Sequence, residues 1–201
     1  MAQTMTASKM TDGQIENTLD KFRCALRKHR EEITSEAAQM ALGVENIGML
    51  MLAPFKERAE VLSGMIVRHV TVNRSRNPQE MLDATGRRQY TNIEVVNNVP
   101  RGKGEETDVF FFKIGRWISD DDLEKEYERR GLKPDPYAQG AVNETDPSFA
   151  DTKPNGTHWK GSDGKWYYAA FGQWVGDERY VRVDRFDYGW NDRWWFGGVR
   201  K

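Results

Sequence analysis

The 201-residue chain contains a single cysteine and no apolar run long enough to cross a bilayer. One thiol, Cys24, cannot form an intramolecular disulfide, so the cysteine content gives no indication of an oxidising compartment. A membrane-spanning helix needs about 20 consecutive apolar residues, and the polar first eleven residues lack the apolar core of a secretory signal. The sequence therefore predicts a cytoplasmic protein without a membrane partner.

Recognisable catalytic and cofactor motifs are also lacking. The chain has no HExxH, GxSxG or CxxC motif, and its three histidines, His29, His69 and His158, are not paired in sequence. The segment 100–106 has the glycines and lysine of a phosphate loop, but we expect it to join two strands as a hairpin loop. We predict no cofactor and no bound metal. The sequence leaves enzymatic activity open and favours a non-enzymatic protein.

The net charge is only −1, which disfavours a general nucleic-acid coat, but the charges are unevenly placed. Residues 68–103 carry seven Lys/Arg against three Asp/Glu, whereas residues 104–152 carry six against thirteen. Four arginines bracket a helix expected after Asn77: Arg74, Arg76, Arg87 and Arg88. They either pair with the acidic segment that follows or present a phosphate or nucleic-acid site at the start of that helix.

The N-terminal third reads as helical. Residues 1–11 have no apolar period and are expected to be disordered. In the helical segment 12–64, apolar residues at Ile15, Leu19, Phe22 and Leu26 form one stripe of a helix ending near residue 32. A second helix is expected from a Thr34 or Ser35 cap to a stop at Gly43, and a third over residues 47–63.

A mixed α/β region is expected over residues 65–154. Two-residue periodicity predicts strands at 65–73 and 107–114, and a further strand is suggested at 95–99. Caps predict two helices: Asn77 with Pro78 and Glu80 begins one that Gly86 stops, and residues 118–132 hold the other. Four prolines in residues 133–154 indicate an extended connector.

Six of the seven tryptophans lie in residues 155–201, where aromatic runs alternate with turn residues. This pattern predicts a meander of three or four antiparallel strands, forming one compact unit with residues 65–154. The predicted fold class is α+β, with the N-terminal helical segment packed on an antiparallel sheet that ends in this Trp-rich meander.

One strand of the meander carries an unusual face. Tyr180, Arg182 and Phe186 project from one side of it, opposite Val181 and Val183. Either the N-terminal helices cover this side or it is a recognition surface. We predict a binding protein that uses these three residues, with Trp190 and Trp194, to engage a protein partner or a second copy of itself.

Two other functions stay open. Nucleic-acid or phosphate binding would use the four arginines of the basic segment. A hydrolase site would combine His158 with aspartates of the meander. These aspartates are Asp163, Asp184, Asp187 and Asp192.

Several short segments in the last two-thirds of the chain have distinctive sequences. They are 82–87 (LDATGR), 111–113 (FFK), 130–134 (RGLKP), 155–160 (NGTHWK), 168–171 (YAAF) and 194–201 (WWFGGVRK). On these segments the chain from about Arg74 onward resembles a family of small hypothetical proteins predicted from bacterial genomes. The resemblance implies a bacterial or phage-borne cytosolic protein and brings no activity with it.

Overall fold

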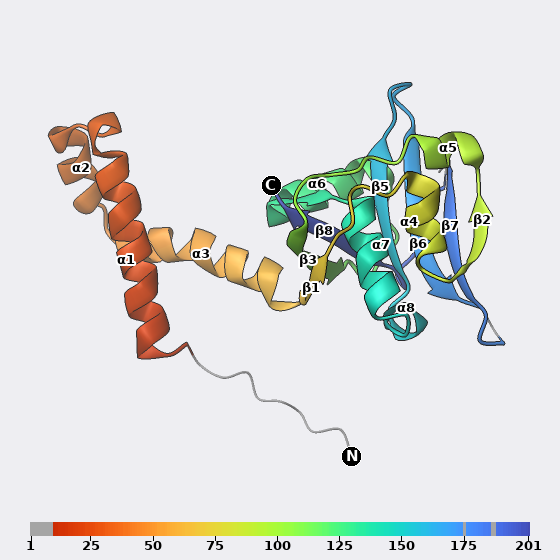
Figure 1. The fold of residues 1–201 in the computed structure, drawn as a ribbon. Coiled ribbons are helices and arrows are strands. Elements are labelled where there is room, and N and C mark those ends of the chain that lie inside the picture. The colour runs from red at the N-terminus through yellow and green to blue at the C-terminus, as the bar shows by residue number, and fades with distance from the viewer. Residues whose placement is uncertain (1–9, 175, 186–187) are drawn as a thin grey trace, which may run out of the picture. The chain divides into compact units, whose positions relative to one another are not determined.

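The computed structural model describes residues 10–174, 176–185 and 188–201. The chain divides into two compact units, Met1–Lys56 and Glu57–Lys201 (Figure 1).

The first unit is helical. It contains α1 (Asp12–Lys28), the short 3-10 helix η1 (Arg30–Glu32), α2 (Ser35–Leu42) and the start of α3 (Ile47–Ser63). The expected caps are confirmed, since the Thr34 hydroxyl accepts from the Ala37 backbone and Gly43 ends α2. No residue of α1, η1 or α2 is buried. The stripe predicted on α1 is therefore not buried among the described residues of these helices.

The second unit is built on an eight-stranded sheet. Its strands are β1 (Ile66–Thr71), β2 (Arg88–Thr91), β3 (Glu106–Lys113), β4 (Leu132–Pro134), β5 (Asn155–Lys160), β6 (Trp166–Gln173), β7 (Arg179–Arg185) and β8 (Trp195–Arg200). Its helices are α4 (Pro78–Asp83), α5 (Ile93–Asn97), α6 (Asp120–Arg130), α7 (Pro136–Thr145) and α8 (Phe149–Thr152). The α+β class is confirmed.

The sheet is mixed but largely antiparallel. Its order is β1-β3-β8-β5-β6-β7-β2, and β4 pairs with β8 off this path. β5, β6 and β7 form the antiparallel meander that the sequence predicted. β8 lies outside the meander, between β3 and β5, and runs parallel to β5. The edge strand β2 runs parallel to β7.

Each face of the sheet has its own hydrophobic core. One core includes Leu82 of α4, Val96 of α5, Val142 of α7 and Phe149 of α8, packed against side chains such as Phe171. Figure 1 shows α4 and α7 lying across this face. The other core lies under α6. Its members are Phe112, Ile118, Leu123, Tyr127, Leu132, Tyr168, Ala170, Trp190 and Phe196.

Local capping signals were read correctly from the sequence. At α4, the Asn77 side chain accepts from the Glu80 backbone while the Glu80 carboxylate accepts from the Asn77 backbone. At α6, Ser119 accepts from the Asp122 backbone, and Gly131 ends the helix in the left-handed conformation.

Two predicted elements were wrong. Residues 95–99, expected as a strand, lie largely in α5, so the loop 100–106 leads from a helix into β3 and is not a hairpin. Residues 133–154, expected as an extended connector, contain α7 and α8. The cause is local: Asp135 caps α7 and Pro136 occupies its first turn, where proline is compatible with a helix. β2 had no counterpart in the prediction.

Candidate functional site

The candidate site lies on the α6 face of the sheet, at the end formed by β7 and β2. Along β7, Tyr180, Arg182 and Asp184 point to this face, whereas Val181 and Val183 enter the opposite core. The register with β2 places Tyr90 beside Arg182. The side chains of β7 thus alternate between the two faces as predicted. The neighbour of Arg182, Tyr90, comes from β2, which is distant in sequence.

Three aromatic rings form a cluster at this end of the sheet. Tyr180 is 4% exposed, because its ring lies over Gly172, where an added Cβ would come within 2.7 Å of the Tyr180 hydroxyl. Trp174 stacks on Tyr180 with ring centroids 4.3 Å apart. Tyr90 meets both rings edge-on at 6.4 Å. Trp174 and Tyr90 remain 44% and 40% exposed, so they present the cluster to the outside.

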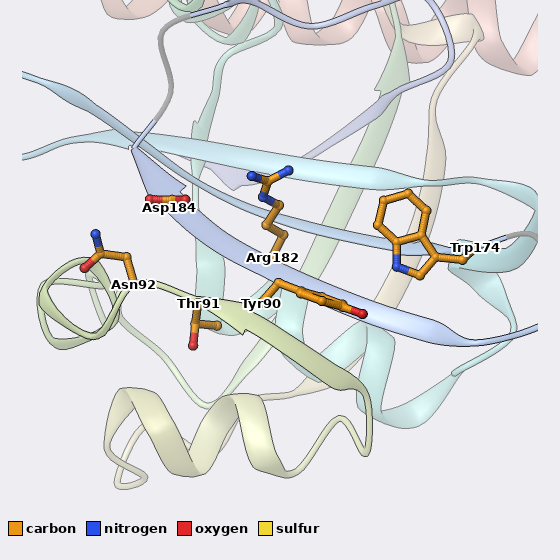
Figure 2. A pocket seen from close by; sticks show the side chains of 6 residues that line it. All are labelled: Tyr90, Thr91, Asn92, Trp174, Arg182 and Asp184. Atoms are coloured by element: carbon orange, nitrogen blue, oxygen red, sulfur yellow. The ribbon is translucent and has the colours of Figure 1, made fainter.

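Beside the cluster is a shallow pocket of about 460 Å³. It is lined by Tyr90, Thr91, Asn92, Trp174, Arg182 and Asp184. Figure 2 shows Arg182 between Asp184 and Trp174, with Tyr90 facing them from β2. The lining combines two aromatic surfaces, one cation, one carboxylate and neutral polar groups. Such a mixture suits a ligand that has both apolar and charged parts.

Ion pairs connect the elements around the pocket. Arg88 of β2 pairs with Glu178 at 2.8 Å, and Arg185 of β7 pairs with Glu94 of α5 at 3.0 Å. Arg179, also on β7, forms a bidentate contact with Asp151. Arg182 differs from these arginines, because no carboxylate among the described residues lies within ion-pair distance of it. It is exposed in the pocket and forms no ion pair with a described residue.

The five residues predicted to bind a partner differ in how exposed their side chains are. Arg182 is exposed, as expected. Tyr180 and Trp190 are not the exposed anchors that the sequence predicted: both are buried, Tyr180 under Trp174 and Trp190 in the core beneath α6. Trp194 is half-buried against Trp190. Phe186 lies outside the described residues.

The exposed aromatic residues of the cluster are Tyr90 and Trp174, and neither was predicted from the sequence as a site residue. Trp174 lies two residues before Gly176, and a large aromatic near a glycine turn was the available signal. Tyr90 had no such signal, since only the long-range pairing of β2 with β7 places it there.

His158 occupies a second polar cluster, within the core. Its ring is fully buried, and its Nδ1 lies 2.8 Å from Asp120 Oδ1, which also accepts from the Trp190 indole at 3.0 Å. His158 Nε2 lies 3.4 Å from Glu124 Oε2, an ionic contact without hydrogen-bond alignment. The Trp166 ring stacks on the imidazole with centroids 4.4 Å apart. Burial opposes protonation of His158, but Asp120 and Glu124 together raise its pKa above the ordinary value.

This arrangement corrects the hydrolase hypothesis. The acids at His158 come from α6 rather than from the meander. Asp163 accepts from the Tyr167 hydroxyl, and Asp184 lines the pocket at β7. Asp192 is exposed, and Asp187 lies outside the described residues. The imidazole is fully buried, and its contact with Asp120 ties α6 to β5.

A second hollow of about 480 Å³ opens next to this cluster. Its lining is Asp121, Glu124, Lys125, Pro134, Trp159, Lys160 and Trp166. The charged groups here are already engaged, since Asp121 accepts from the Trp166 indole and Lys160 lies 5.0 Å above the same ring. The first pocket, whose arginine forms no ion pair with a described residue, is therefore the stronger candidate.

The four arginines predicted for phosphate binding are all engaged. Arg74 pairs with the buried Asp135 at 2.7 Å, and Arg76 pairs with Glu144 at 2.6 Å. Arg88 pairs with Glu178. Arg87 is 5% exposed and donates to the carbonyls of Gly172 and Pro147. Two of the four, Arg74 and Arg76, thus pair with the acidic segment, which was one of the two predictions made for these arginines.

Within the described ranges, no group of three or more His, Cys, Asp or Glu side chains is arranged to hold a metal ion. No helix in those ranges is both long and apolar enough to cross a membrane. Comparison with protein-family models, with curated proteins and with solved structures finds no match for the chain.

Proposed function

We propose that the protein is a non-enzymatic binding protein that recognises an acidic segment of a protein partner in the pocket between β2 and β7. The observation that carries the proposal is Arg182. It is exposed beside the rings of Tyr90 and Trp174, and no described carboxylate forms an ion pair with it.

The chemistry of the pocket defines the ligand. A guanidinium binds a carboxylate through two parallel hydrogen bonds, which favours an Asp or Glu side chain opposite Arg182. The exposed surfaces of Trp174 and Tyr90 favour an apolar or aromatic neighbour of that acid, and Trp, Tyr and Arg dominate the energetics of protein interfaces. Asn92 and Asp184 offer polar groups to the backbone of the bound segment.

A protein segment fits this pocket better than a nucleic-acid strand. Strand binding relies on several cations that follow a phosphate backbone. Here Arg182 shares the pocket with Asp184, and the neighbouring Arg88 and Arg185 already pair with glutamates. Among the described residues, Arg182 is the one cation that lines the pocket, which suits a single carboxylate.

The test is a selection of random displayed peptides against the full chain, followed by affinity measurements on the enriched peptides. Arg182→Ala and Trp174→Ala should each weaken binding by about 30-fold, equivalent to roughly 2 kcal/mol. Arg116→Ala and Trp117→Ala are matched controls, because both side chains are exposed and neither lines the pocket.

The proposal requires that enriched peptides contain an acidic residue and that the controls bind like the wild type. Enriched peptides without acidic residues, or equal affinity for the wild type and Arg182→Ala, would refute it. Thermal unfolding of each variant separates a loss of binding from a loss of folding.

A further inference from the structure

Helix α1 carries an apolar seam that the described residues of its unit leave about half exposed. Ile15, Leu19, Phe22 and Leu26 follow each other at spacings of four, three and four, the pattern of a coiled-coil seam. Their exposed fractions are 41%, 49%, 43% and 46%. A stripe of this kind is stable in water when a second helix covers it, because a lone helix of this length is marginal.

The charges of α1 are separated along its length. Its first nine residues contain three acids, Asp12, Glu16 and Asp20, and no base. Its last eight contain four bases, Lys21, Arg23, Arg27 and Lys28, and no acid. The helix dipole favours this order at the two ends, but it does not account for the apolar seam between the charges.

We propose that α1 pairs in antiparallel orientation with α1 of a second copy of the chain. Reversing one helix places the acidic half of each copy against the basic half of the other. It also sets Leu19 of one copy against Phe22 of the other, and Ile15 against Leu26, so the seam closes on itself. A parallel pair would place like charges side by side along the whole helix.

The residues that flank the seam support the same orientation. At 100° per residue, Glu16 and Arg23 lie on one side of the seam, and the small Thr18 and Ala25 lie on the other. Across a two-fold axis, Glu16 of each copy faces Arg23 of the other. The surface is therefore self-complementary, as a two-fold interface must be.

Other helices of the first unit can extend this interface. Met40 and Leu42 of α2, and Met49 and Leu50 of α3, are 58–77% exposed. Two heptads alone form a weak pair, so this additional apolar surface adds to the burial. The pairing does not depend on the function proposed for the pocket. A dimer would carry two copies of that pocket.

Sedimentation equilibrium of the full chain in the micromolar range tests the association. We expect a mass near twice that of one chain. The double variant Leu19→Glu/Phe22→Glu should weaken association at least about 100-fold, since it places carboxylates in an apolar seam. Asn17→Glu/Cys24→Glu is the matched control, because it adds the same charges on the opposite side of α1 and should leave the dimer intact.

Cysteine pairing tests the orientation. In a Cys24→Ser background, Asp12→Cys and His29→Cys put thiols at the two ends of the seam, and one of the two chains carries an affinity tag. An antiparallel pair gives mainly the mixed disulfide between the two chains. A monomer throughout the concentration range, a dimer that survives Leu19→Glu/Phe22→Glu, or disulfides mainly between identical chains would each overturn the proposal.

Discussion

Arg87 is a cation that the structure places in the interior. Its guanidinium donates to the carbonyls of Gly172 and Pro147 and to the Asn143 side chain, and burial lowers its pKa to about 10. Removing it leaves buried acceptors without donors. We expect Arg87→Ala to reduce the free energy of unfolding by about 3 kcal/mol, measured by urea denaturation.

The neighbouring arginine is the control for this prediction. Arg88 forms an exposed pair with Glu178, and such pairs contribute little in water. Arg88→Ala should therefore leave the urea midpoint almost unchanged. Equal effects of the two substitutions would show that the interior contacts of Arg87 do not stabilise the fold.

His158 gives the fold a pH dependence of defined sign. Because its pKa is raised in the folded state, the folded chain binds the proton more tightly than the unfolded chain. The resulting stabilisation is fully present below the unfolded pKa of about 6.5 and is lost as the pH rises through the folded pKa. In His158→Gln this contribution is absent, so the stability difference between wild type and variant should shrink as the pH is raised from 6 upward.

Urea denaturation of both proteins between pH 5.5 and about 9 measures this difference. Asp120→Asn is an informative companion, because it removes the carboxylate in contact with Nδ1 while keeping a polar side chain there. A wild-type minus His158→Gln difference that does not vary with pH would contradict the raised pKa.

At the level of elements, β5 and β6 have glycines where large aromatic rings pack on the sheet: Gly156 under Trp190 and Gly172 under Tyr180. Gly156 on β5 lies under Trp190, and an added Cβ would stand 2.5 Å from the indole ring. A buried tryptophan held by the Asp120 carboxylate has little freedom to move away. Gly156→Ala should therefore destabilise the second unit by about 1–3 kcal/mol.

Gly64→Ala is the comparison, since a Cβ there meets nothing within 4 Å. Differential scanning calorimetry of the two variants should show a lower unfolding temperature for Gly156→Ala alone. An unchanged temperature would mean that Trp190 can shift, and the indole contact with Asp120 would then not be rigid.

The elements also show which parts of this fold a sequence can predict. α6 was found because its signals are local: Ser119 caps it, Gly131 ends it, and both act within a few residues. α7 was missed although Asp135 and Pro136 are also a cap and a first turn, because the four prolines of residues 133–154 were taken together as an extended segment. That interpretation gave more weight to the proline content of the segment than to the position of Pro136 directly after a capping residue.

The candidate site was predicted in part for the same physical reason. The alternation along β7 assigned Arg182 to the correct face. Trp174 covers Tyr180, and Tyr90 packs beside both rings. These contacts depend on strand pairing that the local sequence does not reveal. Likewise, Asp120 pairs with His158 across 38 residues, and a contact at that separation has no local signal.

For the whole molecule, the two units differ in how much they bury. All of the buried hydrophobic residues among those described lie between Val70 and Val199, within the second unit. A fragment of residues 57–201 should therefore unfold cooperatively with the same urea midpoint as this unit has in the full chain. Its circular dichroism spectrum should lose helical signal in proportion to α1, η1, α2 and residues 47–56 of α3. A fragment that does not fold would show that the first unit is required for the core.

The position of β8 has a consequence for synthesis of the chain. β8 follows every other strand in sequence, yet it lies between β3 and β5 in the sheet. Translation delivers β8 about 80 residues after β3, or roughly 4–16 s later at ordinary elongation rates. Until then the growing chain has open strand edges at β3 and β5, and such edges pair readily with other chains. We therefore expect aggregation to compete with folding during this interval, until residues 195–200 pair with β3 and β5.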